Sequence, residues 1–316
     1  MQFKEFPQFK NEISPRLRSS FVLKAIGAVI LVLNKCRHML KGYTTPRLID
    51  ITKYDDIIHY DVEVTNMWMQ WLELYAPDTS LQNKTVLELG PGADLGIGAM
   101  CIVQGAKKYI TLDKHRLLTT VSLDFYTQLF NFLKKKYTIS NSLYNIIMSD
   151  IDAAYNKKKG SRIVYNVDSS FSLRSLDIEK KSVDLILSNA AFEHFEDLAK
   201  LLSELSDIVK KDALFVAQID LQTHSRWIRD ADPNNIYRYS SWFYNLCKFS
   251  GSPNRMRPRD YAQYMEDAGW TDVTVVPLQV TSASYTSKYH THMHKQFKYI
   301  NNDLDILTCM VLARKL

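Results

Sequence analysis

A regular alternation of short apolar runs and longer amphipathic stretches, beginning at Lys84, most constrains how this chain can fold. Such alternation is typical of βαβ units built on a parallel sheet with helices on both faces. It predicts strands at residues 85–89, 108–112, 162–167, 183–188, 213–219, 272–280 and 306–313. The last two runs are separated by a loop instead of a crossover helix, so we expect the final strand to be antiparallel in a mainly parallel sheet.

The first predicted strand runs directly into a glycine turn. Gly90-Pro91-Gly92 follows it and precedes a helix near Leu95, which leaves backbone N–H groups accessible to a ligand. Asp113 ends the next strand, where an acidic residue binds ribose hydroxyls in nucleotide-binding βαβ units. The structural alternative is a tight turn beside a solvated aspartate.

Two residues near the turn discriminate between nucleotides. Leu95 stands where dinucleotide-binding folds place a third glycine. Glu88 lies two residues before the first glycine, where its charge would oppose a pyrophosphate but suit a ligand that carries an ammonium group. Both observations favour S-adenosylmethionine over NAD.

Three segments resemble a known family. VLELGPGADLGIG, then Asp113, then VDLILSNAAFEHF resemble motifs I, II and IV of class I Rossmann-like S-adenosylmethionine-dependent methyltransferases, over roughly residues 80–316. The resemblance implies a seven-stranded sheet, mainly parallel with the last strand antiparallel. It also implies that Glu88, Gly90 and Gly92 surround the methionine end of the cofactor, while Asp113 holds the ribose.

The resemblance assigns further positions after other strands. Ser188 and Asn189, at the end of the fourth strand, would line the cleft beside the sulfonium. The loop after the third strand normally carries an acidic residue for the adenine amino group, and the candidates are Asp168 or a residue nearer Ser172. We choose Asp168 because it follows the strand directly. A turn-forming aspartate among serines is the alternative.

A base is needed if the methyl acceptor is a hydroxyl group. Glu193 and His194 follow the fourth strand, and His194 is the better base by its ordinary pKa. Asp220 and His224 follow the fifth strand, where they could orient one another. Glu193 could instead stabilise a helix start, and Asp220 and His224 could form a satisfied polar turn.

The loop before the helix predicted at 258–268 suggests an acceptor site. Asn254, Arg255 and Arg257 suit an oxygen-rich acceptor, such as a sugar or a phosphorylated group. Solvated surface arginines are the alternative. The segment from Asp220 through this loop loosely resembles methyltransferases that accompany bacterial surface-polysaccharide synthesis.

Residues 1–80 are expected to form a helical extension to a methyltransferase domain at 81–316, with helices near 20–40 and 60–76. Residues 21–33 are nearly all apolar. Basic residues flank them on both sides, so that the apolar run and its flanks together span residues 16–41. At about 1.5 Å per residue the apolar run reaches only about 20 Å, short of the roughly 30 Å hydrocarbon core. Two interpretations remain: a helix docked on the catalytic domain, which we favour, or a helix lying in a membrane interface.

Composition excludes several other classes. The net charge of +6 is too small and dispersed to indicate nucleic-acid binding. The four cysteines are far apart, which is typical of free thiols in a cytoplasmic protein. We expect no metal site, although His290, His292 and His294 are close together, because no carboxylate cluster accompanies them.

These observations predict an S-adenosylmethionine-dependent O-methyltransferase that acts on a hydroxyl of a glycan or glycolipid. A small-molecule methyltransferase is the enzymatic alternative. A catalytically silent scaffold that binds the cofactor is the alternative outside catalysis, and a dehydrogenase is disfavoured by Leu95 and Glu88.

Overall fold

The computed structural model of the chain describes residues 2–4, 6–42, 53–118, 121–298 and 303–316. The chain forms two compact units. Unit 1 contains Met1–Thr44, Ala190–Leu198 and Gln218–Val311, and unit 2 contains Thr45–Asn189, Ala199–Ala217 and Leu312–Leu316. The two predicted N-terminal helices therefore fall in different units, and the predicted division at residue 80 stays a prediction.

The predicted α/β fold is confirmed, and each of the seven predicted strands is present. They are β3 (Thr85–Leu89), β4 (Lys108–Asp113), β5 (Ile163–Val167), β6 (Val183–Asn189), β7 (Val209–Asp220), β8 (Trp270–Thr281) and β9 (Ile306–Lys315). Two short strands, β1 (Gln2–Phe3) and β2 (Asn11–Ile13), pair in parallel with β8. The strands follow the hydrogen-bonded order β1-β8-β9-β7-β6-β3-β4-β5, mostly parallel with antiparallel strands at the C-terminal end of the chain.

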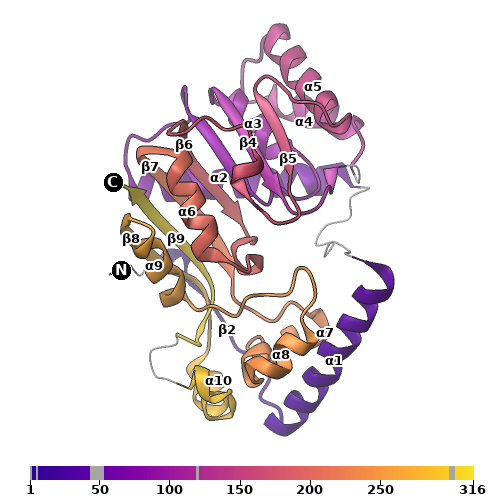
Figure 1. The fold of residues 1–316 in the computed structure, drawn as a ribbon, viewed down its shortest axis with the longest axis vertical. Coiled ribbons are helices and arrows are strands. Elements are labelled where there is room, and N and C mark those ends of the chain that lie inside the picture. The colour runs from indigo at the N-terminus through magenta and orange to yellow at the C-terminus, as the bar shows by residue number, and fades with distance from the viewer. Residues whose placement is uncertain (1, 5, 43–52, 119–120, 299–302) are drawn as a thin grey trace. The chain divides into compact units, whose positions relative to one another are not determined.

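In unit 2, parallel pairing sets the register of the motif strands (Figure 1). Leu89 pairs with Leu112 of β4 on one side and with Ser188 of β6 on the other. β4 pairs in turn with β5, so that Asp113 lies opposite Val167. The carboxyl ends of these strands consequently meet at one edge, where open α/β sheets bind ligands.

Helices of unit 2 cover this part of the sheet with apolar faces. They are α2 (Tyr54–Tyr75), α3 (Gly96–Val103), α4 (Asp124–Leu133), α5 (Asn141–Tyr155) and most of α6 (Leu198–Ile208). α2 packs on α3 and α4, and α3 also contacts α5. α4 follows β4 after a connection in which residues 119–120 lie outside the described residues.

Unit 1 is built around aromatic residues and includes the first long helix, α1 (Ser20–Lys41). Its other helices are α7 (Arg226–Arg229), α8 (Ser241–Cys247), α9 (Pro258–Asp267) and α10 (Ala283–Tyr289), with short 3-10 turns at Phe192–His194, Asn235–Arg238, His290–His292 and Lys295–Phe297. The connection between β8 and β9, expected as a loop, thus carries α10 and two of these turns.

α1 is tied into unit 1 by polar bonds as well as by packing. Leu23 lies in the core cluster of this unit. Asn235 donates to the carbonyl of Leu23 at 3.0 Å, and the Tyr239 hydroxyl donates to that of Lys24 at 2.7 Å. A Cβ added at Gly27 would come within 1.9 Å of the Asn235 side chain. α1 therefore packs against Asn235 at Gly27, where only glycine fits. Within the described residues, no helix combines the length and apolarity needed to cross a bilayer.

Candidate active site

The turn after β3 leaves its backbone open. Gly90 and Gly92 both have positive φ, 80° and 79°, a conformation that side chains disfavour. The Gly90 N–H donates to the Leu112 carbonyl at 2.9 Å, which holds the turn against the end of β4. A Cβ at Gly92 would meet no atom within 4 Å, so there is space for a ligand beside this glycine.

Asp113 lies beside this turn, as predicted. Its carboxylate accepts hydrogen bonds from Gly92 N–H at 3.3 Å and from His115 N–H at 3.2 Å. Burial raises the pKa of Asp113 to about 6, and these backbone N–H groups partly offset that increase. Asp113 is therefore a buried hydrogen-bond acceptor at the end of β4, the position at which nucleotide-binding units hold ribose hydroxyls.

Three further carboxyl groups lie around the turn: Glu88 on β3, Asp94 before α3 and Asp61 on α2. Burial raises the pKa of Glu88 well above its usual range, and the neighbouring Asp94 and Asp113 raise it further. Burial likewise raises the pKa of Asp61, followed by the effect of Asp94. The charged neighbours that shift these pKa values are themselves acidic. Such a site favours a cationic ligand, because a cation would relieve the repulsion.

Unsatisfied acceptors point to the same kind of ligand. Glu88 Oε2 and Asn189 Oδ1 are buried and have no hydrogen-bond partner. Buried polar atoms without partners are uncommon in native proteins. An ammonium and a sulfonium, together with ribose hydroxyls, would supply the positive charge and the donors that these atoms lack. The residues present therefore fit S-adenosylmethionine.

The predicted neighbours at the end of β6 have distinct roles. Ser188 is fully buried and donates to the Leu89 carbonyl at 2.9 Å, so it joins β6 to β3. Asn189 donates to the Tyr60 hydroxyl at 2.8 Å, which directs its carbonyl oxygen away from that bond. Of the two, Asn189 has the acceptor still available to a ligand.

Sequence reasoning missed Tyr60 and Asp61, which α2 brings to this site. A signal was available: Asp61 falls in register with Val64 and Trp68 in the buried stripe of the helix. A carboxylate in an apolar helix face is uncommon unless it has a partner or a ligand. The helix also contacts the turn closely, because a Cβ added at Gly96 would lie 2.0 Å from Asp61 Oδ2.

Asp168 is engaged by its own loop. Its Oδ1 accepts from Ser170 N–H at 2.9 Å, from the Ser170 hydroxyl at 2.6 Å and from Ser172 N–H at 3.1 Å. These bonds, that of the Ser170 side chain first, lower the pKa of Asp168 to about 2. The residue has the turn-forming geometry that was its alternative interpretation, and its contact with adenine stays a prediction.

A second cluster lies within unit 1, where Glu193, His194 and His224 come together. His224 Nε2 is 3.3 Å from His194 Nε2 and 3.8 Å from Glu193 Oε1. The sequence offered the two histidines as separate candidates 30 residues apart, and the structure joins them. Each of these three residues also offers one atom that could bind a metal ion, and the three atoms lie within 4.8 Å of one another. His290, His292 and His294 are not part of this group.

Hydrogen bonding orients His224. Its Nδ1 lies 3.0 Å from the Gln222 carbonyl, which can only accept, so Nδ1 carries the proton and Nε2 of the neutral ring has a lone pair. Burial lowers the pKa of His224, which keeps the ring neutral at pH 7. Burial raises the pKa of Glu193 well above its usual range, and the nearby Asp220 raises it further. The cluster is thus a half-buried proton-accepting group beside a buried carboxyl.

Asp220 does not bond directly to His224. It forms an ion pair with Arg229 at 2.8 Å and accepts from Gln222 N–H at 3.0 Å. The bond from Gln222 N–H fixes the position of Gln222, whose carbonyl orients His224. Asp220 is therefore placed to act on the histidine through Gln222.

The loop residues predicted to bind the acceptor form many contacts within unit 1. Asn254 donates to the carbonyls of Phe192 and Phe195, at 3.2 and 3.1 Å, and so braces the turn that carries Glu193 and His194. Arg255 is buried and donates to the Tyr239 carbonyl at 2.8 Å.

Arg257 is also buried, and it donates to the carbonyls of Asp303 and Ile306. These contacts exclude the interpretation of Arg255 and Arg257 as solvated surface residues. The acceptor-binding role of Asn254, Arg255 and Arg257 stays a prediction.

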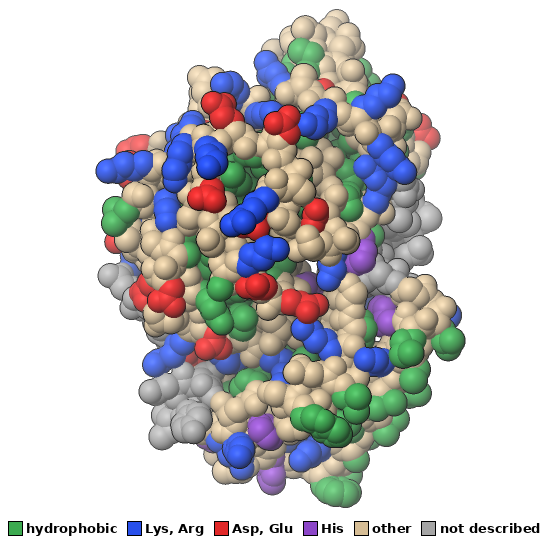
Figure 2. Space-filling view, viewed as in Figure 1, with side chains coloured by type: hydrophobic (Ala, Val, Ile, Leu, Met, Phe, Trp, Pro, Cys, Tyr) green, Lys and Arg blue, Asp and Glu red, His purple; other side chains and the backbone are tan. Residues whose placement is uncertain are grey.

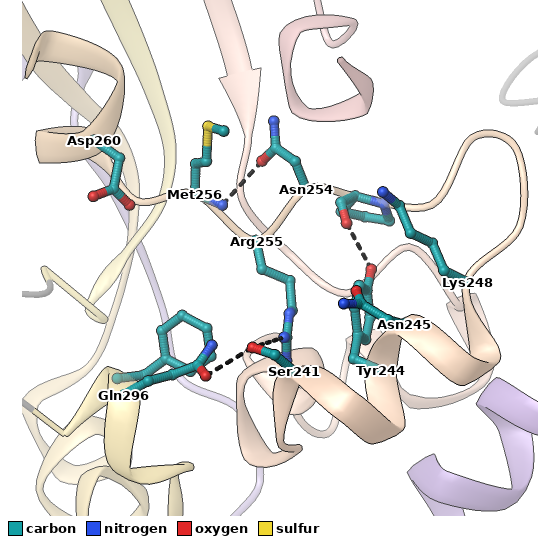
Figure 3. Close-up of a pocket in the computed structure, with 11 residues that line it drawn as sticks. Ser241, Tyr244, Asn245, Lys248, Asn254, Arg255, Met256, Asp260 and Gln296 are labelled. Carbon is teal, nitrogen blue, oxygen red and sulfur yellow. Dashed lines mark hydrogen bonds between the residues drawn. The ribbon is translucent and has the colours of Figure 1, made fainter. Parts of the chain in front are cut away.

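A pocket of about 290 Å³ lies beside this loop (Figure 3). Polar side chains line most of it: Ser241, Asn245, Lys248, Asn254, Arg255, Asp260 and Gln296. Arg255 bonds to Ser241 at 3.1 Å, and Ser241 bonds to Gln296 at 2.8 Å. The pocket is suited to a ligand with several oxygen atoms, and it contains two of the three predicted acceptor-binding residues.

Comparison with known proteins identifies the class of this chain. A family model described as a methyltransferase domain matches residues 60–275, so the chain belongs to this family. It is an enzyme of the S-adenosylmethionine-dependent methyltransferase class, as the motifs predicted. No curated protein sequence matches the chain.

Solved structures of methyltransferases are similar at low identity. An S-adenosylmethionine-dependent methyltransferase from Mesorhizobium loti is 14% identical with a TM-score of 0.42, covering 78% of this chain and 97% of its own. Geranyl diphosphate C-methyltransferase from Streptomyces coelicolor A3(2) is 14% identical with a TM-score of 0.45, covering 86% of each chain. Phosphoethanolamine N-methyltransferase 2 from Haemonchus contortus is 11% identical with a TM-score of 0.44, covering 87% of this chain and 61% of its own. We draw nothing about the acceptor from these likenesses.

Proposed function

We propose that this methyltransferase methylates a hydroxyl oxygen of a polar, oxygen-rich acceptor, a glycan or glycolipid of the kind found in bacterial surface polysaccharides. The observation that carries the proposal is the Glu193–His194–His224 cluster, in which Glu193 is buried and both histidines are half-buried. A hydroxyl must lose its proton as the new bond to oxygen forms, and the neutral imidazole of His224 offers a nitrogen that can take it up.

Residues of unit 2 would hold the cofactor. Glu88 and Asp61 would face its positive charges, Asp113 would accept from the ribose hydroxyls, and Asn189 would accept through its free carbonyl oxygen. The bound cofactor supplies an electrophilic methyl group on a sulfonium sulfur. The chain then contributes chiefly alignment of the acceptor and removal of its proton.

The histidine pair would take up that proton. Nδ1 of His224 holds the ring proton, so Nε2 carries the lone pair and is the nitrogen that would accept the acceptor proton. Glu193 Oε1, which lies 3.8 Å from His224 Nε2, would be next to the imidazolium formed in this way. Because burial penalises that charge, the pair also releases its proton readily once the product has formed.

The polar pocket supports the choice of acceptor. Its lining of hydroxyl, amide and basic groups suits sugar hydroxyls and any accompanying phosphate. A small-molecule acceptor remains the enzymatic alternative, and a scaffold that binds the cofactor without turnover remains the other.

The test is transfer of a labelled methyl group from S-adenosylmethionine to pools of polysaccharide precursors, glycolipids and small phenols, with the methylated atom located by mass spectrometry. We expect label on a glycan or glycolipid oxygen. Label confined to phenols would favour the small-molecule alternative, and binding of S-adenosylhomocysteine without turnover on any pool would favour the scaffold.

Variants link the transfer to the cluster. His194→Asn and His224→Asn should lose turnover yet bind S-adenosylhomocysteine normally, whereas His292→Asn, on an exposed histidine outside the cluster, should behave as the wild type. A chelator should leave turnover unchanged. Loss of activity with a chelator, restored by a divalent metal, would instead assign the same three residues to a metal site.

A further inference from the structure

α1 exposes a wide apolar face. The residues on this face include Phe21, Ile26, Val29, Leu33, Met39 and Leu40, with exposed fractions from 48% to 86%. At 100° per residue they fall within an arc of roughly 140°. Figure 2 shows hydrophobic side chains gathered over α1. Monomeric soluble proteins rarely leave so continuous an apolar surface in contact with water.

This face cannot turn inward. The opposite side of α1 buries Leu23, Gly27 and Ile30 in unit 1. The Cβ clash at Gly27 and the bonds from Asn235 and Tyr239 fix the rotation of the helix about its own axis. The apolar arc is therefore a permanent outer surface of unit 1.

Basic residues border the arc. Lys24 lies at one margin and Arg37 and Lys41 lie at the other, all exposed. α1 contains no aspartate or glutamate. An apolar face flanked by lysine and arginine is the pattern of helices that lie in the interface of an anionic bilayer.

Neighbouring helices extend the surface. α7 and α8 both contact α1. Trp227 on α7 and Trp242 on α8 are 76% and 74% exposed, and Leu246 on α8 is 58% exposed. Figure 2 shows a second group of hydrophobic side chains over α8. Exposed tryptophans are favoured at the level of lipid headgroups, where the ring meets both apolar and polar surroundings.

We propose that unit 1 docks on the surface of an anionic lipid bilayer, with α1 lying in the plane of the interface and the tryptophans of α7 and α8 inserted beside it. A second copy of the chain is a poorer occupant, because a symmetric contact would bring the basic margins of two α1 helices together. The proposal is independent of the identity of the methyl acceptor.

Flotation with vesicles tests this docking. The full chain should float with phosphatidylcholine vesicles that contain phosphatidylglycerol and bind those of phosphatidylcholine alone at least ~10-fold more weakly, since the basic margin requires anionic lipid. Tryptophan emission should shift to shorter wavelength on binding and be quenched by brominated lipid. A full chain that stays unbound to the anionic vesicles would overturn the proposal.

Matched variants locate the surface. Val29→Asp with Leu33→Asp should reduce binding by at least ~10-fold, because two charges enter the apolar arc. The control, Leu74→Asp, alters a residue 43% exposed on α2 of unit 2 and should bind as the wild type. Unchanged far-UV circular dichroism and Tm would establish that the double variant is folded. Equal flotation of the double variant and the wild type would contradict the proposal.

Two further measurements complete the test. Arg37→Glu with Lys41→Glu should lose the preference for anionic vesicles, and Arg37→Lys with Lys41→Arg should keep it. Analytical ultracentrifugation examines the alternative occupant. If Val29→Asp with Leu33→Asp converted a dimer to a monomer without changing flotation, the face would be a contact between copies and the lipid proposal would be wrong.

Discussion

The proposed cofactor site of unit 2 and the histidine cluster of unit 1 are constructed in different ways. Most residues of the proposed cofactor site lie at or just after the end of a strand, as Glu88, Gly90 and Asp113 do, and parallel pairing brings those strand ends together. The histidine cluster depends on two segments without regular strand structure, braced by Asn254 from a third segment.

Strand pairing defines the unit 2 site, whereas side-chain contacts define the unit 1 cluster. Backbone hydrogen bonds between the strands fix the positions of the strand ends relative to one another. The proposed cofactor site should therefore tolerate changes in individual loops. The histidine cluster has no such frame, and small changes in its supports should disturb its chemistry while leaving cofactor binding intact.

The sharpest contrast should come from His224→Asn. Removal of a general base typically costs 10²–10⁴-fold in rate, so we expect kcat to fall by about that factor. Calorimetric titration with S-adenosylhomocysteine should give an unchanged Kd. A parallel loss of cofactor affinity would show that the two regions are not functionally separate.

Asp113→Ala should have the converse effect. Loss of a buried charged acceptor costs about 1.5–3 kcal/mol, so Kd for S-adenosylhomocysteine should rise by roughly 10-fold to 100-fold. Asp168→Ala, in a residue already engaged by Ser170 and Ser172, provides the comparison and should change Kd much less. Equal losses in the two variants would assign Asp168 to the cofactor as well.

The acidity of Asp113 predicts how binding depends on pH. Its raised pKa of about 6 means that the free protein is protonated there at lower pH, whereas ribose hydroxyls and a cation favour the ionised form. Affinity should thus be constant above about pH 7 and weaken by up to ~10-fold per pH unit below 6. Titrations from pH 5 to 8 measure this, and Asp113→Asn should remove most of the dependence.

Asn254→Ala should produce the smallest effect. The side chain braces the Phe192–Phe195 turn with two hydrogen bonds and accepts from Tyr261 at 3.0 Å. Each bond contributes about 1 kcal/mol, part of which water can replace, so a decrease in kcat of about 3-fold to 30-fold is expected. Cofactor Kd should stay constant, and Asn254→Asp, which keeps the acceptor oxygen, should recover part of the rate.

The sequence predicted the fold, and it placed the glycine turn and Asp113 at neighbouring strand ends, because these features depend on local patterns. Strand ends, glycines and a spaced aspartate can be recognised without knowledge of tertiary contacts. β1 and β2 could not be recognised, because two and three residues are too short to show a period. Asp61 was missed because it reaches the site from α2, well before the motif.

The unit 1 site shows where sequence patterns stop being informative. In a sequence, two arginines separated by one residue form the same pattern whether they are solvated or buried. Arg255 is buried because carbonyls of Ile236 and Tyr239 converge on it, and Arg257 because those of Asp303 and Ile306 do. Likewise, the meeting of His194 with His224 depends on loops whose path has no periodic signal.

The glycine contact of α1 has a consequence for how this protein can be released from a surface. Excision of α1 would strip acceptors from Asn235 and Tyr239 and open the aromatic core beside Leu23. Loss of α1 would therefore damage unit 1 itself, and the docking proposed above calls for release through a change in lipid composition instead of removal of the helix.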